Sequence, residues 1–72
     1  NISRIFLFSD GITDEGNMES FSFGKERLEE LLGSNIKTSI DNIPNIIIKS
    51  LKKWRNGAEQ RDDQTLITLE LP

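Results

Sequence analysis

The sequence predicts an α+β fold in the order strand, loop, helix, helix, strand, with the two strands antiparallel. Three observations support this prediction: an apolar run near the start, two stretches with helical hydrophobic spacing, and an alternating run at the end. The chain has 72 residues and a formal net charge of −3. A domain of this size buries only about 60 % of its unfolded surface, so a partner or a further segment is expected to contribute stability.

The first strand is predicted over residues 4–9, which read Arg-Ile-Phe-Leu-Phe-Ser. Both alternating faces are apolar, which is typical of a strand inside a sheet with cover on both sides. Asp10 and Gly11 follow as a turn, so the carboxylate stands just past the end of the strand. Residues 12–22 are mostly polar and predict a loop.

Two amphipathic helices are predicted next. The first covers residues 25–32, where leucines recur at helical spacing and Gly33 stands at the C-cap position. The second covers residues 43–56, with Pro44 in its first turn and Asp41 or Asn42 as N-cap. Its apolar stripe is predicted to be core and its basic residues a solvated face. The stripe consists of Ile43, Ile46, Ile47, Leu51 and Trp54.

The last strand is predicted over residues 64–71, and one of its two alternating faces is expected to be buried. One face carries Thr65, Ile67, Leu69 and Leu71, and the other carries Leu66, Thr68 and Glu70. Asp62 and Asp63 directly precede this strand. In an antiparallel pair, the end of one strand lies beside the start of the other, so Asp10 and Asp62 are expected at the same edge. Carboxylates gathered there would repel unless a cation lay between them. The alternative is that these aspartates form only a turn and a polar lead-in to the strand.

The composition excludes several classes of site. Cysteine and histidine are absent, which excludes disulfides, the usual zinc ligands and a Ser-His-Asp triad. The remaining carboxylates favour hard cations such as Mg²⁺ or Mn²⁺. The acidic balance argues against a nucleic-acid partner. The sequence holds neither a long apolar run nor a signal peptide, so we expect a soluble chain with no membrane contact from this segment.

Three ordered motifs resemble a known family. They read Phe-Leu-Phe-Ser-Asp-Gly-Ile-Thr-Asp over residues 6–14, Phe-Gly-Lys-Glu-Arg-Leu over residues 23–28, and Asp-Asp-Gln-Thr-Leu-Ile over residues 62–67. Together they resemble the last third of a bacterial SpoIIE-type phosphatase domain, one of the metal-dependent PPM (type 2C) serine/threonine phosphatases. The resemblance implies that residues 1–72 are the C-terminal segment of an incomplete domain, a fragment of an αββα sandwich.

The resemblance also implies a metal site. In this family, aspartates on the central strands surround two Mn²⁺ or Mg²⁺ ions. Asp10 and Asp62 match metal ligands of the family and would act in catalysis through the metal. Gly11 matches the glycine that lets the backbone turn close to the metal, and Asp63 occupies a supporting position.

The activity that the resemblance implies is hydrolysis of phosphoserine or phosphothreonine on a bacterial signalling phosphoprotein by a hydroxide generated on the metal ions. In related proteins the substrate is an anti-anti-sigma type regulator. The family's other metal ligands precede the matched segment, so residues 1–72 alone are expected to bind metal weakly or not at all, to be inactive, and to need the remainder of the domain. Three alternatives stay open: a noncatalytic interaction module with the same fold, a fragment that forms a homodimer through its helix stripes, and an unrelated small α+β domain.

Overall fold

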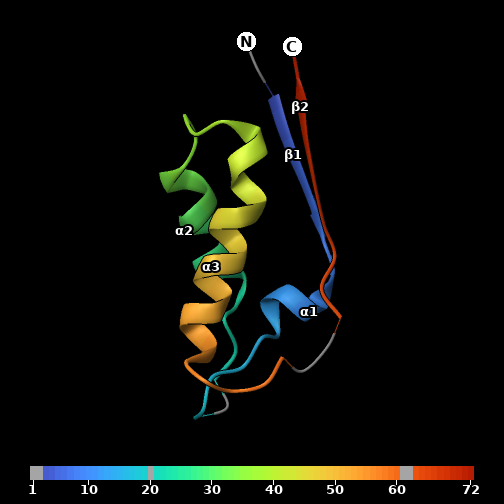
Figure 1. Ribbon diagram of the computed structural model, residues 1–72. Coiled ribbons are helices and arrows are strands. Elements are labelled where there is room, and N and C mark those ends of the chain that lie inside the picture. The colour runs from blue at the N-terminus through green and yellow to red at the C-terminus, as the bar shows by residue number, and fades with distance from the viewer. Residues whose placement is uncertain (1–2, 20, 61–62) are drawn as a thin grey trace.

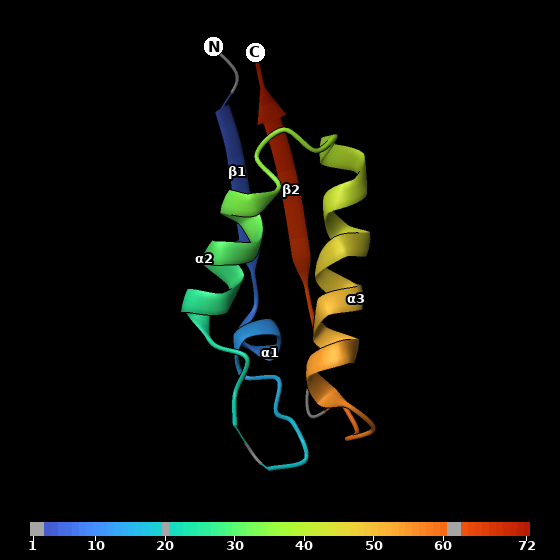
Figure 2. The ribbon, with the colours of Figure 1, turned by 90° about the vertical axis from the view of Figure 1, so that its left-hand side faces the viewer.

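The fold has two layers (Figures 1 and 2). One layer is a sheet of two antiparallel strands, and the other consists of two helices that pack on one face of this sheet. A computed structural model describes residues 3–19, 21–60 and 63–72. The strands are β1 (Ser3–Phe8) and β2 (Leu66–Leu71), and the helices are α2 (Lys25–Ser34) and α3 (Ile43–Arg55). The α+β class, the element order and the antiparallel strands are therefore confirmed.

The core lies between the helices and the sheet. Ile43, Ile47 and Leu51 form the inner face of α3, and each is 1 % exposed. Leu28 of α2 meets them from the neighbouring helix and is equally buried. Their spacing of four residues places the α3 side chains on one side of the helix. The prediction that the helix stripes form the core is thus confirmed.

The helix ends differ in part from the prediction. α2 continues to Ser34, so Gly33 lies inside the helix and the predicted glycine cap is wrong. Asn35 is the C-cap of α2 instead, and its side-chain Nδ2 donates a hydrogen bond to the Leu31 carbonyl at 2.8 Å. The N-cap of α3 is Asn42, which is one of the two residues predicted for this position. No helix in the described residues is long and apolar enough to cross a bilayer.

Two short elements were not predicted. Residues 12–22 were expected to be a loop, but α1 (Asp10–Thr13) forms directly after β1, and its turn closes where the Asp14 N–H donates to the Asp10 carbonyl at 2.7 Å. A 3₁₀ turn, η1 (Ile40–Asn42), precedes α3. A single turn is too short to produce hydrophobic periodicity, so the pattern could not reveal either element.

The two faces of the sheet are covered unequally. The helices pack on the face that carries Phe6 and Leu66, which contact the core. The opposite face holds large apolar side chains that are 41–53 % exposed, and we call it the open sheet face: Ile5, Leu7, Ile67, Leu69 and Leu71. The helices therefore cover the face of β2 that carries Leu66, and the face that carries Ile67 is open. Both faces of β1 are apolar, and the alternation in β2 does not by itself show which face the helices cover.

Candidate functional site

The end of β1 and the start of β2 meet at the edge of the sheet that lies away from the chain termini (Figure 1). Beyond the last strand pair, the Ser9 N–H donates to the Thr65 carbonyl at 3.0 Å. The Thr65 N–H donates in return to the Ser9 hydroxyl oxygen at 2.9 Å. The side-chain oxygen replaces a backbone acceptor because the chain turns into α1 at this point. These two bonds hold the segment that leads into α1 beside the segment that leads into β2.

Gly11 lies at the closest approach between these two segments. It is buried, and a Cβ built on it would lie 2.1 Å from the carbonyl oxygen of Asp63. Any side chain at this position would therefore collide with backbone. On the other side of the peptide, the Gly11 carbonyl accepts a hydrogen bond from Gln64 Nε2 at 3.1 Å. The absence of a side chain at residue 11 lets the two backbones touch.

The predicted site residues fall on this edge as far as the structure describes them. Asp10 is the first residue of α1 and is exposed. Asp63 is also exposed, and its carbonyl faces Gly11. Asp62 lies outside the described residues. The structure thus brings together the segments that carry Asp10 and Asp63.

A partial set of donors for a hard cation is present at this edge. Carboxylate oxygens are the ligands that Mg²⁺ and Mn²⁺ prefer. Asp10 and Asp63 supply such groups from two touching segments, and Gly11 leaves room for the close approach. Within the described residues, no cluster of three or more acidic, histidine or cysteine side chains could hold a metal by itself. Carboxylates are the kind of group that holds a divalent cation, but the described residues alone do not complete such a site.

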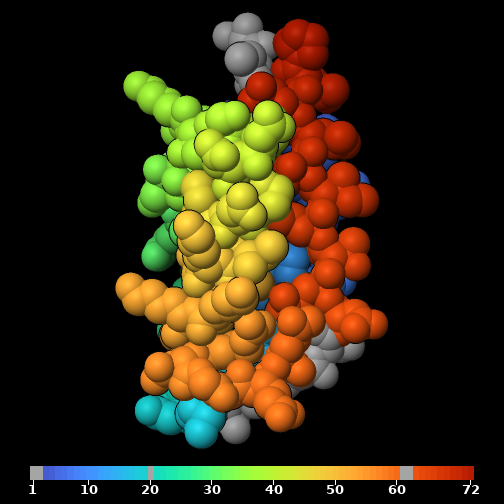
Figure 3. Space-filling view, viewed as in Figure 1, coloured from blue at the N-terminus to red at the C-terminus, as the bar shows by residue number. Residues whose placement is uncertain are grey.

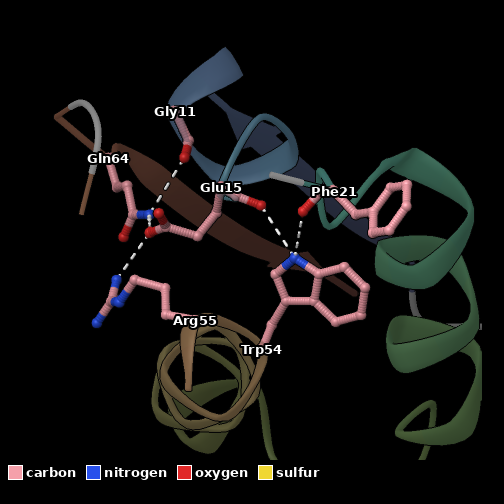
Figure 4. Close-up of polar contacts among 6 residues, drawn as sticks. All are labelled: Gly11, Glu15, Phe21, Trp54, Arg55 and Gln64. Atoms are coloured by element: carbon pink, nitrogen blue, oxygen red, sulfur yellow. Dashed lines mark hydrogen bonds and ion pairs between the residues drawn. The ribbon is translucent and has the colours of Figure 1, made fainter. Parts of the chain in front are cut away.

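A buried acidic side chain lies behind the edge. Glu15 is 1 % exposed, and its Oε2 accepts hydrogen bonds from Arg55 Nη1 at 2.7 Å and from Gln64 Nε2 (Figure 4). Gln64 Nε2 also donates to the Gly11 carbonyl. We call Glu15, Arg55 and Gln64 the Glu15 cluster. It connects α3 to both segments of the edge.

No pattern in the sequence indicates the Glu15 cluster. Glu15 stood in a predicted polar loop, and Arg55 was assigned to the solvated face of the second helix. Arg55 and Glu15 are 40 residues apart, and Gln64 and Glu15 are 49 apart. Only the three-dimensional fold shows that they meet.

Trp54 fixes the segment that contains Glu15. Its indole N–H donates to the carbonyls of Glu15 at 3.1 Å and of Phe21 at 3.0 Å (Figure 4). The ring meets Phe23 edge to face at 6.0 Å between centroids, and the guanidinium of Arg27 lies 4.1 Å from its centroid. Trp54 is therefore a packing residue, as predicted.

A groove separates α3 from the segment that leads into β2, on the face shown in Figure 3. Its volume is 410 Å³, and its walls are mainly apolar, with polar groups from Lys52, Arg55 and Gln64. Asp10 does not line it. Arg55 and Gln64 of the Glu15 cluster line the groove, so the groove adjoins this cluster.

Comparison with protein families identifies the chain. The model of the family described as stage II sporulation protein E (SpoIIE) matches residues 2–72. The chain belongs to the SpoIIE family. The match spans all three motifs on which the resemblance rests, and family membership makes the chain part of a phosphatase-related protein. Searches among curated proteins and among solved structures found no match.

Proposed function

We propose that the chain is the C-terminal part of a metal-dependent PPM-type serine/threonine phosphatase domain. The observation that carries this proposal is the contact between the two segments that the family motifs mark, where the Ser9 and Thr65 bonds hold the start of α1 beside Asp63. Membership of the SpoIIE family supports the same conclusion. Asp10 and Asp62 are the proposed ligands, with Gly11 and Asp63 in support.

The proposed chemistry requires little from the protein beyond placement. Two bound Mn²⁺ or Mg²⁺ ions would supply an activated water and would neutralise charge on the phosphoryl oxygens. Asp10 would hold these ions from the segment after β1, and Asp62 would hold them as the residue before Asp63 in the sequence. Neither cysteine nor histidine is needed as a nucleophile or base in such a site, and the sequence contains neither.

The proposed substrate is phosphoserine or phosphothreonine on a bacterial signalling phosphoprotein, by family resemblance an anti-anti-sigma type regulator, and the proposed location is the cytoplasm. The remainder of the domain is the proposed partner of the open sheet face. This face exposes Ile5, Leu7, Ile67, Leu69 and Leu71. Apolar side chains gathered on one surface are typical of a contact with another protein segment.

The proposal is tested in the protein that carries the complete domain. Asp10→Asn and Asp62→Asn should each lower Mn²⁺-dependent hydrolysis of a phosphopeptide by about 100-fold or more, because each removes an anionic ligand. Asp41→Asn is the matched control. Asp41 is an exposed residue of η1 at the other end of the molecule, so the same change there should leave the rate within about twofold of the unsubstituted protein.

Two results would count against the proposal. If Asp10→Asn or Asp62→Asn keeps full turnover, that residue is not a ligand. If the unsubstituted protein binds its partner but hydrolyses no phosphopeptide with either metal, the noncatalytic interaction module is the correct function.

A further inference from the structure

The Glu15 carboxylate is enclosed by protein, although a carboxylate at the surface would keep its favourable free energy of hydration. Its side chain is fully buried, and moving a carboxylate out of water is unfavourable unless charge and hydrogen bonds compensate. Arg55 supplies the opposite charge at 2.7 Å. Among the described residues, Glu15 Oε1 has no hydrogen-bond partner, so both observed bonds converge on Oε2.

Oε2 therefore fixes the amide of Gln64. The Nε2 group carries two hydrogens, and it makes two bonds, one to Glu15 Oε2 and one to the Gly11 carbonyl (Figure 4). Both donors are engaged, so the amide cannot rotate without losing a bond. Gln64 thus transmits the position of the buried carboxylate to the backbone at Gly11.

The Gly11 carbonyl belongs to the residue that follows Asp10, and the Gln64 backbone follows Asp63. A side chain that bonds to Gly11 from residue 64 therefore sets the spacing between the two segments that carry the proposed ligands. Ser9 and Thr65 set this spacing on the sheet side, and Gln64 sets it on the α3 side.

We propose that Glu15 and Gln64 are positioning residues of the metal site, in which Glu15 orients Gln64 and Gln64 holds the Gly11 carbonyl, so that the ligand segments keep the separation that the metal requires. This inference rests on the proposed function. Neither Glu15 nor Gln64 is one of the aspartates that the resemblance marks as metal ligands. Partners that orient metal ligands in this way change metal affinity by about 10- to 100-fold when they are removed.

Direct Mn²⁺ binding tests the inference. Isothermal titration with Mn²⁺, on the protein that carries the complete domain, should give a Kd for Gln64→Met at least about tenfold higher than for the unsubstituted protein. Methionine fills a similar volume but cannot donate to either acceptor. Glu70→Gln is the matched control. It disrupts the Arg4–Glu70 ion pair of 2.8 Å at the opposite end of the ladder and should leave the Kd within about twofold.

A double exchange separates a positioning role in metal binding from a purely structural role in the fold. Glu15→Gln combined with Gln64→Glu keeps one carboxylate and one amide in the cluster, so the two side chains can still bond to each other. A carboxylate at residue 64 cannot donate to the Gly11 carbonyl. If the Glu15 cluster only stabilised the fold, the double variant would bind Mn²⁺ with the same Kd as the unsubstituted protein. We expect its Kd to stay at least about tenfold higher, with thermal unfolding recovered relative to Gln64→Met.

The outcomes are distinct. A Kd within about twofold of the unsubstituted value in either variant, with the fold intact by circular dichroism, overturns the positioning role. If Gln64→Met does not fold, the double variant alone decides the question by the same criterion. If the unsubstituted protein binds no Mn²⁺, the proposed function fails as well. Binding by the unsubstituted protein together with unchanged variants refutes only the positioning role.

Discussion

Gly11→Ala adds one methyl group at the contact between α1 and the segment before β2. Its carbon would lie 2.1 Å from the Asp63 carbonyl oxygen and 3.0 Å from the Asp63 carbonyl carbon. Ordinary contact begins near 3.4 Å, so the two backbones must move apart by about 1.3 Å. That displacement would also stretch the hydrogen bonds between Ser9 and Thr65, because they join the same two segments.

The free energy of unfolding should fall by about 2 kcal/mol. Overpacking against backbone costs about 3 kcal/mol, at the upper end of the usual range, and the better helix propensity of alanine in α1 returns about 1 kcal/mol. Gly33→Ala is the matched control. Gly33 is also helical, but nothing lies within 4 Å of its added carbon, so alanine there should stabilise by up to about 1 kcal/mol.

Thermal unfolding of the protein that carries the complete domain measures both effects. The difference of about 3 kcal/mol between the two variants corresponds to a Tm gap of about 6–12 °C for a domain of ~150–250 residues. Gly11→Ala should also weaken Mn²⁺ binding, whereas Gly33→Ala should not. Equal Tm values for the two variants would refute the close approach at Gly11 and, with it, the geometry of the edge.

Two further outcomes follow from the same structure. Trp54→Phe should lower the free energy of unfolding by about 1–2 kcal/mol in chemical denaturation, because the indole N–H donor is lost. The loss is limited because the Glu15 and Phe21 carbonyls each still accept a hydrogen bond from a backbone N–H. An unchanged denaturation midpoint would show that the indole hydrogen bonds contribute nothing to stability. The isolated 72-residue chain, freed of metal and then supplied with Mn²⁺, should hydrolyse no phosphopeptide, because the ligands at its edge are incomplete. Turnover by this chain would contradict the need for further ligands.

The sequence was sufficient for features that depend on periodicity. The stripe of Ile43, Ile47 and Leu51 repeats at helical spacing, and it is buried in the structure. The strands likewise followed from a run of apolar residues and an alternating run, and their antiparallel pairing brought the segments of Asp10 and Asp63 to one edge. These features are local or follow from the order of the elements.

Features that depend on contacts between distant residues could not be predicted. Alternation in β2 showed two faces, but the choice between them depends on where the helices pack, and Ile67 lies on the open one. The end of α2 depends on a side-chain bond from Asn35, which overrides the weak signal of Gly33. The pairing of Glu15 with Arg55 follows no pattern in the chain, because a buried charge has the same sequence signature as an exposed one.

The most direct test of the central claim is the position of the metal itself. Crystals of the protein that carries the complete domain, grown with Mn²⁺, would locate the ions by anomalous scattering. We expect a peak within about 2.0–2.6 Å of a carboxylate oxygen of Asp10, in a site to which Asp62 also contributes. Anomalous peaks that lie only away from both residues would contradict a shared metal site at this edge of the sheet.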